Sequence, residues 1–381
     1  MNVIARAAFA TAGVAAAACT SDPSALDPDP ALVAERHGAS SVERGAVYVA
    51  SNAAAGNQIL IFVRAPNGSL SGPETVATGG TGTGGGLGNQ AGLVLLPDRR
   101  LLLVVNAGSN DVSVFRVSPH GITLLDREPS GGATPVSIAV HDQLVYVLND
   151  GGTANIAGFR LKDGGNLVPI SGSIRPLSAA APDAAQIAFG AGGQVLIVTE
   201  KATNLLSTYT VDGSGLAQGP NPQPSAGMTP FGFAVRRGLV VVSEAFGGAP
   251  DGSALSSYEL GAGGTLNVIS ASVGTTETAA CWVVITPDGR YTYTTNTGSG
   301  TISGYSIGPT GSLHLLDANG VTATTSAGPI DLALAQNGRF LYSLDEAGGT
   351  ISAFEIESDG SLVPIGGAVV VPQGANGLAA R

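Results

Sequence analysis

Seven polar side chains recur at one position of a repeated sequence pattern, and their types suit binding or acid–base chemistry. All are amides or acids: Asn52, Asn106, Asn149, Glu200, Glu244, Asn296 and Asp345. Oxygen acceptors that converge from several repeats would suit a hard cation, a hydroxyl-rich ligand or a cationic group. Grouped carboxylates can also raise one another's pKa, which would make Glu200 or Glu244 a general acid or base. The pattern therefore predicts a ligand-binding mouth with these two glutamates as candidate catalytic residues.

The same residues also have a purely structural interpretation. Asn and Asp at the end of a strand commonly begin a turn by bonding to nearby backbone groups. Glu is a poorer turn residue, so Glu200 and Glu244 distinguish the two interpretations best.

Each of the seven residues ends a hexad whose other members are mostly apolar. The hexads are VYVASN (47–52), LLLVVN (101–106), LVYVLN (144–149), VLIVTE (195–200), LVVVSE (239–244), YTYTTN (291–296) and FLYSLD (340–345). Their starts lie 43 to 54 residues apart, which is the spacing of four-stranded propeller blades.

The rest of each repeat supplies three more expected strands. A turn and a strand with an aromatic residue near its end follow each hexad; the aromatics are Phe62, Phe115, Phe159, Tyr209, Tyr258, Tyr305 and Phe354. We expect them to pack between blades. A further strand follows a Gly turn, and a short apolar strand such as WVVIT precedes the next hexad. We label these strands A (short apolar), B (hexad), C (aromatic) and D, and predict an all-β, seven-bladed propeller with antiparallel blades.

The two ends of the repeat region are complementary. The first hexad has no convincing A strand before it, whereas the terminal segment NGLAAR (376–381) matches the A pattern. We therefore expect the C-terminal strand to close the ring against residues 47–52, which removes a free sheet edge.

This arrangement adds candidate residues to the mouth. The end of strand B lies beside the start of strand A, so both contribute to the same end of the central funnel. Gln186, Trp282 and Asp331 stand at the starts of A strands and are expected to bind ligand with the hexad residues, while Lys201 and Glu346 flank them.

Composition narrows the function classes. The chain has 381 residues with 56 Gly, 44% hydrophobic and 12% charged residues, which favours turn-dense β structure over disorder. The net charge of −11 excludes nucleic acid as an expected partner. The four histidines and two cysteines show no zinc-ligand spacing, so no metal and no cofactor are expected, and Cys281 is expected to pack in the core.

The glycine-rich run 79–88 (GGTGTGGGLG) resembles a phosphate-binding loop only in composition. It lacks a Gly-Lys-Ser/Thr end and a following helix, so we expect a flexible D–A connection.

The first nineteen residues have the features of an export signal. Arg6 precedes a run of small and apolar residues too short to span a bilayer. The end Ala16-Ala17-Ala18-Cys19 partly matches a lipoprotein box, so Cys19 is a candidate lipidation site, with ordinary cleavage as the alternative. We expect a signal peptide (1–19), a linker rich in Ser, Asp and Pro (20–41) and the propeller (42–381). The protein would be periplasmic, extracellular or lipid-anchored.

Segments such as RFLYSLD, GTISAFEI and DGSLVPI resemble the seven-bladed lactonase family, which includes the propeller-type 6-phosphogluconolactonase and proteins named carboxymuconate cyclase. The resemblance covers residues 47–381 and implies the fold and, as one option, lactone hydrolysis. Family lactonases carry His at the starts of innermost strands. The corresponding residues here are Gly92, Ser137, Gln186, Gly232, Trp282, Asp331 and Gly377.

Two functions follow as expectations. The first is a ligand- or partner-binding propeller, expected to be a monomer, whose mouth or loops hold a carbohydrate, another small molecule or a protein. The second is an exported lactone hydrolase with a Glu base, which takes a small-molecule lactone. Fold alone cannot decide between them.

Overall fold

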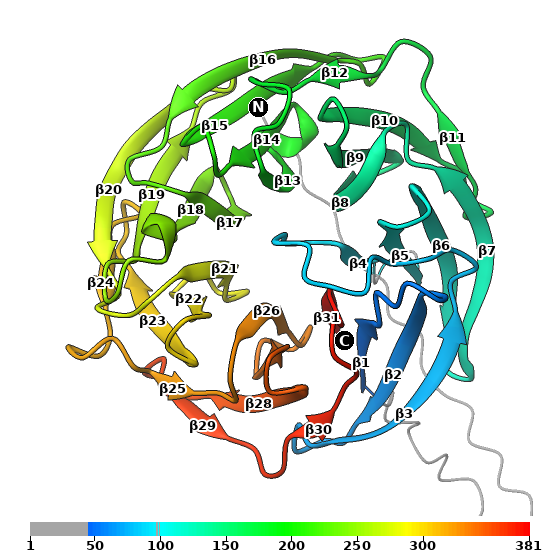
Figure 1. Ribbon diagram of the computed structural model, residues 1–381. Helices are drawn as coiled ribbons and strands as arrows, with labels where there is room; N and C mark the ends of the chain where they lie inside the picture. Colours follow the sequence, from blue (N-terminus) through cyan, green and yellow to red (C-terminus); the bar gives the residue numbers. More distant parts are fainter. Residues whose placement is uncertain (1–44, 97, 99) are drawn as a thin grey trace, which may run out of the picture. The chain divides into compact units, whose positions relative to one another are not determined.

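The computed structural model describes residues 45–96, 98 and 100–381. The expected signal peptide, the linker and Cys19 lie outside these residues. These residues form one compact unit, in which seven antiparallel sheets are arranged around a central axis (Figure 1). This confirms the predicted seven-bladed propeller.

The first four blades each follow the predicted A-B-C-D pattern. Blade one contains β1 (Gly45–Ala50), β2 (Gln58–Arg64), β3 (Leu70–Ala77) and the terminal β31 (Leu378–Ala380). Blade two contains β4 (Leu93–Leu96), β5 (Leu101–Asn106), β6 (Asp111–Ser118) and β7 (Gly121–Pro129). Blade three contains β8 (Ala133–His141), β9 (Leu144–Gly151), β10 (Asn155–Leu161), β11 (Leu167–Pro169) and β12 (Arg175–Pro176). Blade four contains β13 (Ala184–Gly190), the 3₁₀ turn η4 (Ala191–Gly193), β14 (Val195–Glu200), β15 (Leu205–Val211) and β16 (Ala217–Pro224).

The remaining three blades repeat this order. Blade five contains β17 (Pro230–Arg236), β18 (Leu239–Glu244), the 3₁₀ turn η5 (Phe246–Gly248), β19 (Ala254–Leu260) and β20 (Leu266–Gly274). Blade six contains β21 (Ala280–Ile285), β22 (Tyr291–Asn296), β23 (Thr301–Ile307), β24 (Leu313–Leu315) and β25 (Ala323–Thr324). Blade seven contains β26 (Pro329–Leu334), β27 (Phe340–Asp345), β28 (Thr350–Ile356), β29 (Leu362–Pro364) and β30 (Val369–Val370). In blades three, six and seven the outer D strand is divided into two short pieces that pair with the same C strand.

The ring closes as the sequence predicted. Strand β31 pairs antiparallel with β1, with Tyr48 opposite Ala379 and Val49 opposite Leu378. Backbone hydrogen bonds from Arg381 N to Ala46 O (2.9 Å) and from Asn376 N to Ala50 O (2.9 Å) flank this pairing. The first blade therefore takes its innermost strand from the other end of the chain.

Adjacent blades are held together by aromatic packing. The seven strand-C aromatics are at most 2% exposed, and Phe62, for example, packs in one cluster with Phe340 and Tyr342 of the preceding blade. Strand-B tyrosines add a polar contact: Tyr342 donates a hydrogen bond to the carbonyl oxygen of Gly68 (2.8 Å), in the C–D turn of the next blade. The expected inter-blade role of the aromatics is confirmed.

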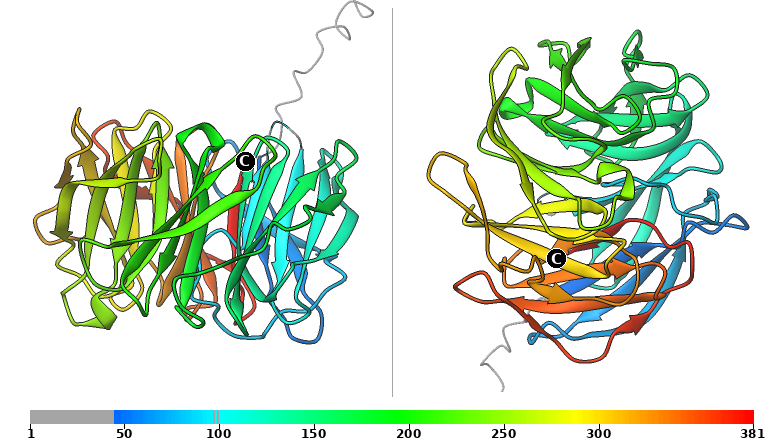
Figure 2. Two further views of the ribbon diagram at one scale, coloured as in Figure 1. Left: turned by 90° about the horizontal axis from the view of Figure 1, so that it is seen from above. Right: turned by 60° about the vertical axis from the view of Figure 1, so that its left-hand side comes forward.

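Strand direction defines two faces of the propeller. Every A strand starts on the face that carries the D–A and B–C loops, which we call the entry face. It ends on the opposite face, which carries the A–B and C–D turns and which we call the exit face. Figure 2 shows the strands running between these two faces.

Candidate functional site

The seven hexad-end side chains lie on the entry face, next to the starts of the inner strands. Glu200 pairs with Ala184 at the start of β13, and Glu244 pairs with Pro230 at the start of β17. The sequence predicted this juxtaposition. All seven side chains are at most 3% exposed, however, so their surroundings decide what they can do.

Both candidate catalytic glutamates are bonded into the loops and strands of their own blades. Glu200 accepts hydrogen bonds from the backbone N–H and hydroxyl of Ser178 and from the hydroxyl of Thr203 (3.0 Å). Glu244 accepts bonds from Gly227 N (2.7 Å), Ser256 Oγ (2.5 Å) and Ser272 Oγ (2.6 Å). Burial raises the pKa of Glu244, and these bonds partly oppose the shift. Both carboxylates are fully buried and hydrogen-bonded.

The other five hexad-end side chains have similar partners. Asp345 accepts bonds from Ser343 Oγ (2.6 Å), Ser352 Oγ and Ser326 N, and burial raises its pKa to about 6. The four amides Asn52, Asn106, Asn149 and Asn296 each donate hydrogen bonds to neighbouring loop or strand groups. These bonds connect the ends of the B strands to strand C and to the D–A loops.

The inner-strand residues connect each blade to the next. Gln186 forms two hydrogen bonds with Phe233 in blade five: Oε1 accepts from its N–H (2.6 Å) and Nε2 donates to its carbonyl (2.9 Å). Asp331 accepts a bond from Leu378 N (2.9 Å) in the closing strand. Burial raises the Asp331 pKa to about 8, because its two backbone donors only partly offset the loss of solvation. These side chains bond to neighbouring backbone.

In blade five the matching position has no side chain, and a loop supplies the missing group. The position in blade five that matches Gln186 is Gly232, and a Cβ built there would overlap Oε1 of Gln90. Gln90 belongs to the D–A loop that leads into blade two, yet it makes the same paired contact with blade six. Its Oε1 accepts from Val283 N (3.0 Å) and its Nε2 donates to Val283 O (2.8 Å).

Residues 88–91 extend this contact to other blades, and we call them the plug. The Gln90 N–H bonds to Ala185 O (3.1 Å) in blade four, and Ala91 O accepts from Ile138 N (2.9 Å) in blade three. The Asn89 side chain donates to Val136 O, and the backbone carbonyl of Asn89 accepts the indole N–H of Trp282. In Figure 1 the loop that precedes β4 projects toward the centre of the ring. The plug thus bonds to the inner strands of blades three, four and six.

A buried lysine holds the start of the plug. Lys201 Nζ donates to Gly88 O (2.6 Å), lies 3.1 Å from the carboxylate of Asp183 and stands 4.6 Å from the centre of the Phe231 ring. Its side chain is 7% exposed. Lys201 was expected only to flank the ring of polar residues, and the structure gives it a specific partner.

The sequence pattern did not reveal the plug, because its residues directly follow the glycine-rich run 79–88, which predicted only a flexible connection. The run 79–88 lies over the B–C turns of blades one and two, with Gly82 N bonded to Ala53 O (2.9 Å) and Gly84 N to Asn52 O (2.8 Å). Two signals were present: the Asn-Gln pair just before an apolar strand, and the glycine at position 232 where neighbouring blades carry longer side chains.

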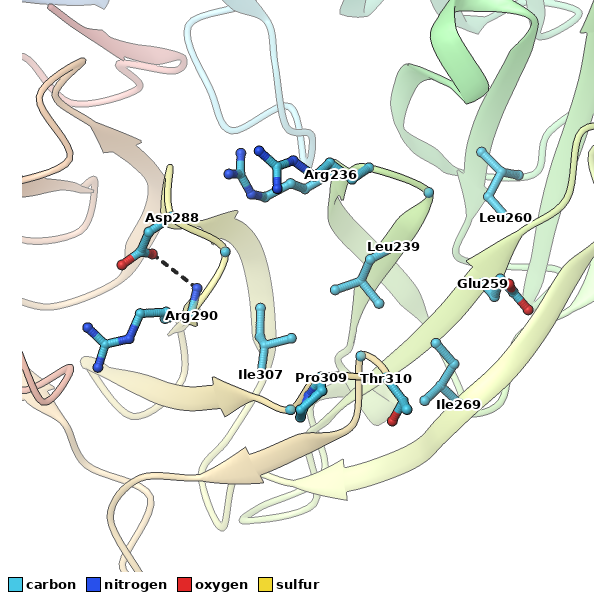
Figure 3. Close-up of a pocket in the computed structure, with 15 residues that line it drawn as sticks. Arg236, Leu239, Glu259, Leu260, Ile269, Asp288, Arg290, Ile307, Pro309 and Thr310 are labelled. Carbon is cyan, nitrogen blue, oxygen red and sulfur yellow. Dashed lines mark hydrogen bonds between the residues drawn. The ribbon is translucent and has the colours of Figure 1, made fainter.

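A pocket of a different kind lies on the exit face, between blades five and six (Figure 3). It has a volume of about 770 Å³. The A–B turn of blade five contributes Arg236 and Arg237, and the corresponding turn of blade six contributes Arg290. No residue proposed from the sequence lines it.

Three further features bear on function: metal-ligand clusters, the cysteine and membrane-spanning helices. Nowhere in 45–96, 98 and 100–381 do three His, Cys, Asp or Glu side chains group so that they could hold a metal ion. Cys281 is a buried free thiol whose pKa burial raises to about 12. No helix within these residues has the length and apolar character needed to cross a membrane.

Comparison with known proteins places the fold in a family. A search of curated proteins found no significant match. Among solved structures, the periplasmic gluconolactonase of Pseudomonas aeruginosa is 15% identical, with a TM-score of 0.70 and coverage of 88% of this chain and 98% of that one. A candidate 6-phosphogluconolactonase of Bacteroides fragilis is 17% identical, with a TM-score of 0.68 and coverage of 90% and 99%. A protein of Lactobacillus plantarum is 14% identical, with a TM-score of 0.72 and coverage of 89% and 99%.

Identities this low show a shared fold and no more. The family model described as "Lactonase, 7-bladed beta-propeller" matches residues 28–176 and 253–377, which is more than half of the chain. The chain therefore belongs to the seven-bladed β-propeller lactonase family.

Proposed function

We propose that this protein is a binding member of the lactonase family and that its central funnel does not hydrolyse lactones. The main observation behind this proposal is the plug, residues 88–91. An active site needs a cavity in which substrate, water and base meet. Here the side chain of Gln90 occupies the space beside Gly232 and bonds to the backbone of blade six.

The candidate bases support the same conclusion. Glu200 and Glu244 are 0% exposed, and each is held by hydrogen bonds from serine or threonine hydroxyls and a backbone N–H. A general base must come within hydrogen-bond reach of the proton that it removes. Reaching a substrate would require each glutamate to give up these partners.

The second candidate function is hydrolysis of a lactone, with Glu244 as the base. Two observations favour it: the structural likeness to proteins named as gluconolactonases, and burial that raises the pKa of Glu244, as general acids and bases often require. Asn52, Asn106, Asn149, Gln186, Trp282, Asn296, Asp331 and Asp345 would then support the funnel wall.

For a binding protein, we place the ligand-contacting surface on the loops of the entry face. The B–C loop of blade five is the longest of the B–C loops, and its residues 247–252 are exposed. The partner would be a carbohydrate or a protein. The net charge of −11 disfavours nucleic acid.

A lactonase assay separates the two functions. Micromolar protein is mixed with D-glucono-1,5-lactone and hydrolysis is followed by acid release, with the Pseudomonas aeruginosa periplasmic gluconolactonase as positive control. We expect the wild type to match the buffer rate. Turnover in the wild type that is lost in Glu200→Gln/Glu244→Gln would establish the hydrolase instead.

We also propose export, on the basis of residues 1–19, with Cys19 as a lipidation site. Cell fractionation and a mass shift after Cys19→Ala would test both steps. Retention of the full-length chain in the cytoplasm would contradict export.

A further inference from the structure

The pocket between blades five and six combines unpaired positive charge with an apolar wall. Figure 3 shows Arg236 directed across the pocket toward the turn that holds Asp288 and Arg290, with Leu239, Ile269 and Ile307 on its other side. All of these residues come from turns and strand ends of the exit face, so the pocket is remote from the plug.

The arginines at this pocket have no carboxylate partner. The ion pairs among the described residues join Arg127 with Asp111, His141 with Asp142, Lys201 with Asp183 and Arg339 with Glu355. None of these four pairs involves Arg236, Arg237 or Arg290. An unpaired guanidinium in a concave site is a ready donor for an anion.

The two acids that line the pocket neutralise only part of this charge. Asp288 Oδ1 accepts bonds from Thr286 Oγ1 (2.6 Å) and Arg290 N (3.0 Å), so it is occupied within its own turn. Glu259 lies on the far side of Leu239 from Arg236 in Figure 3. In a chain with a net charge of −11, three arginines against two acids leave a net positive charge at this pocket, which attracts anions.

The three arginines at the pocket differ in where their guanidinium groups lie. Arg290 is turned toward blade seven: its Nη2 donates to Ser358 O (3.0 Å) of that blade and to Tyr291 Oη (2.9 Å) of blade six. Arg236 lies against the backbone of Gly289, where a Cβ would stand 2.9 Å from its Nε. Arg237 lines both this pocket and an adjoining cavity of about 360 Å³ between blades four and five. Arg236 and Arg237 therefore have guanidinium groups available at the pocket.

We propose that this pocket binds a small organic carboxylate. Arg236 and Arg237 would hold the carboxylate, and an attached apolar chain would cover Leu239, Ile269 and Ile307. Guanidinium groups match the two oxygens of a carboxylate, and the aliphatic wall gains from burying a hydrocarbon chain. The site would act whether or not the central funnel hydrolyses a lactone.

Calorimetric titration with sodium hexanoate tests this site. We expect saturable binding to the wild type, weakening by at least about tenfold in Arg236→Ala/Arg237→Ala. Arg236→Lys/Arg237→Lys keeps the charge but loses the planar fork and should bind with intermediate affinity. The matched control Arg100→Ala/Arg116→Ala removes two arginines from blade two and should bind hexanoate like the wild type.

Two further probes separate the charge from the apolar wall. Sulfate should bind more weakly than hexanoate because it has no chain, and hexylammonium should not bind. Equal hexanoate affinity in the wild type and Arg236→Ala/Arg237→Ala, or equal binding of hexanoate and hexylammonium to the wild type, would overturn the proposal.

Discussion

Asp331 is a buried acid in β26 whose carboxylate accepts hydrogen bonds from two backbone groups, Leu332 N (2.8 Å) and Leu378 N (2.9 Å). Burial raises its pKa to about 8, whereas in the unfolded chain the pKa would be near 3.8. The folded state therefore binds a proton more tightly than the unfolded state. The stability contributed by this group is complete below about pH 4 and is lost as the pH rises through 8.

We predict that the melting temperature of the wild type falls relative to that of Asp331→Asn between pH 5 and pH 9. The amide cannot ionise, although it places an NH₂ near one of the two donors and so lowers stability at pH 5. Scanning calorimetry across this range measures the difference, with Asp359→Asn, a fully exposed acid, as the control. A pH-independent difference between the wild type and Asp331→Asn would contradict the assigned titration.

Residue type and spacing predicted where the hexad-end side chains lie but not what surrounds them. The repeat places Glu200 and Glu244 beside the starts of inner strands, and the structure has them there. Their partner Ser256 does recur, because Ser113, Ser207, Ser303 and Ser352 hold the same place two residues before the aromatic of strand C, whereas Ser178 and Ser272 come from a loop and an outer strand whose sequences do not repeat. Hydrogen-bond networks of this kind depend on tertiary packing, so the burial of the two glutamates could not be predicted from the pattern.

At the scale of elements, Gln90 and Gln186 form a natural comparison. One lies on a loop and the other on strand β13, and both make two hydrogen bonds to the backbone of an inner strand. We predict that Gln90→Ala and Gln186→Ala each lower the free energy of unfolding by about 1–3 kcal/mol, because each leaves buried backbone groups without a partner.

Hydrogen exchange distinguishes the two variants. Only Gln90→Ala should speed exchange of the amides of residues 88–91, because only it releases the plug, while urea unfolding reports the global cost. Unchanged exchange at these amides in Gln90→Ala would mean that the glutamine does not hold the loop.

Gly232 provides a second prediction at this scale. A methyl group there would overlap the Gln90 side chain and stand 2.6 Å from the carbonyl oxygen of Cys281. Gly232→Ala should therefore lower the free energy of unfolding by about 1–3 kcal/mol, the usual range for overpacking. Gly263→Ala, at a position in the same blade with no atom within 4 Å, is the control and should be near neutral in urea unfolding. Equal free energies of unfolding for the two variants would show that the plug can move aside without loss of stability.

For the whole molecule, the prediction concerns the closing strand β31. Removal of residues 376–381 deletes β31 and exposes the inner edge of β1. We expect a large fall in the urea midpoint, with an open first blade visible as an increased radius of gyration in solution scattering. An unchanged midpoint would show that the ring does not depend on this pairing.

The whole fold was far more predictable than the site, for a physical reason. Each blade must bury apolar strands and aromatics such as Phe62 and Phe354 against its neighbours, so the same pattern recurs seven times and identifies itself. The plug occurs once. Its four residues have no repeat to mark them, and a single Gly-rich connection looks like any other loop.

In a plain ring of repeats, each unit bonds only to the two beside it, and units can be gained or lost in evolution while the circle adjusts its diameter. The plug removes that freedom here. Residues 88–91 connect the inner strands of blades three, four and six by hydrogen bonds about 3 Å long. A ring of six or eight blades could not keep all of these bonds, so this one short connection favours seven blades.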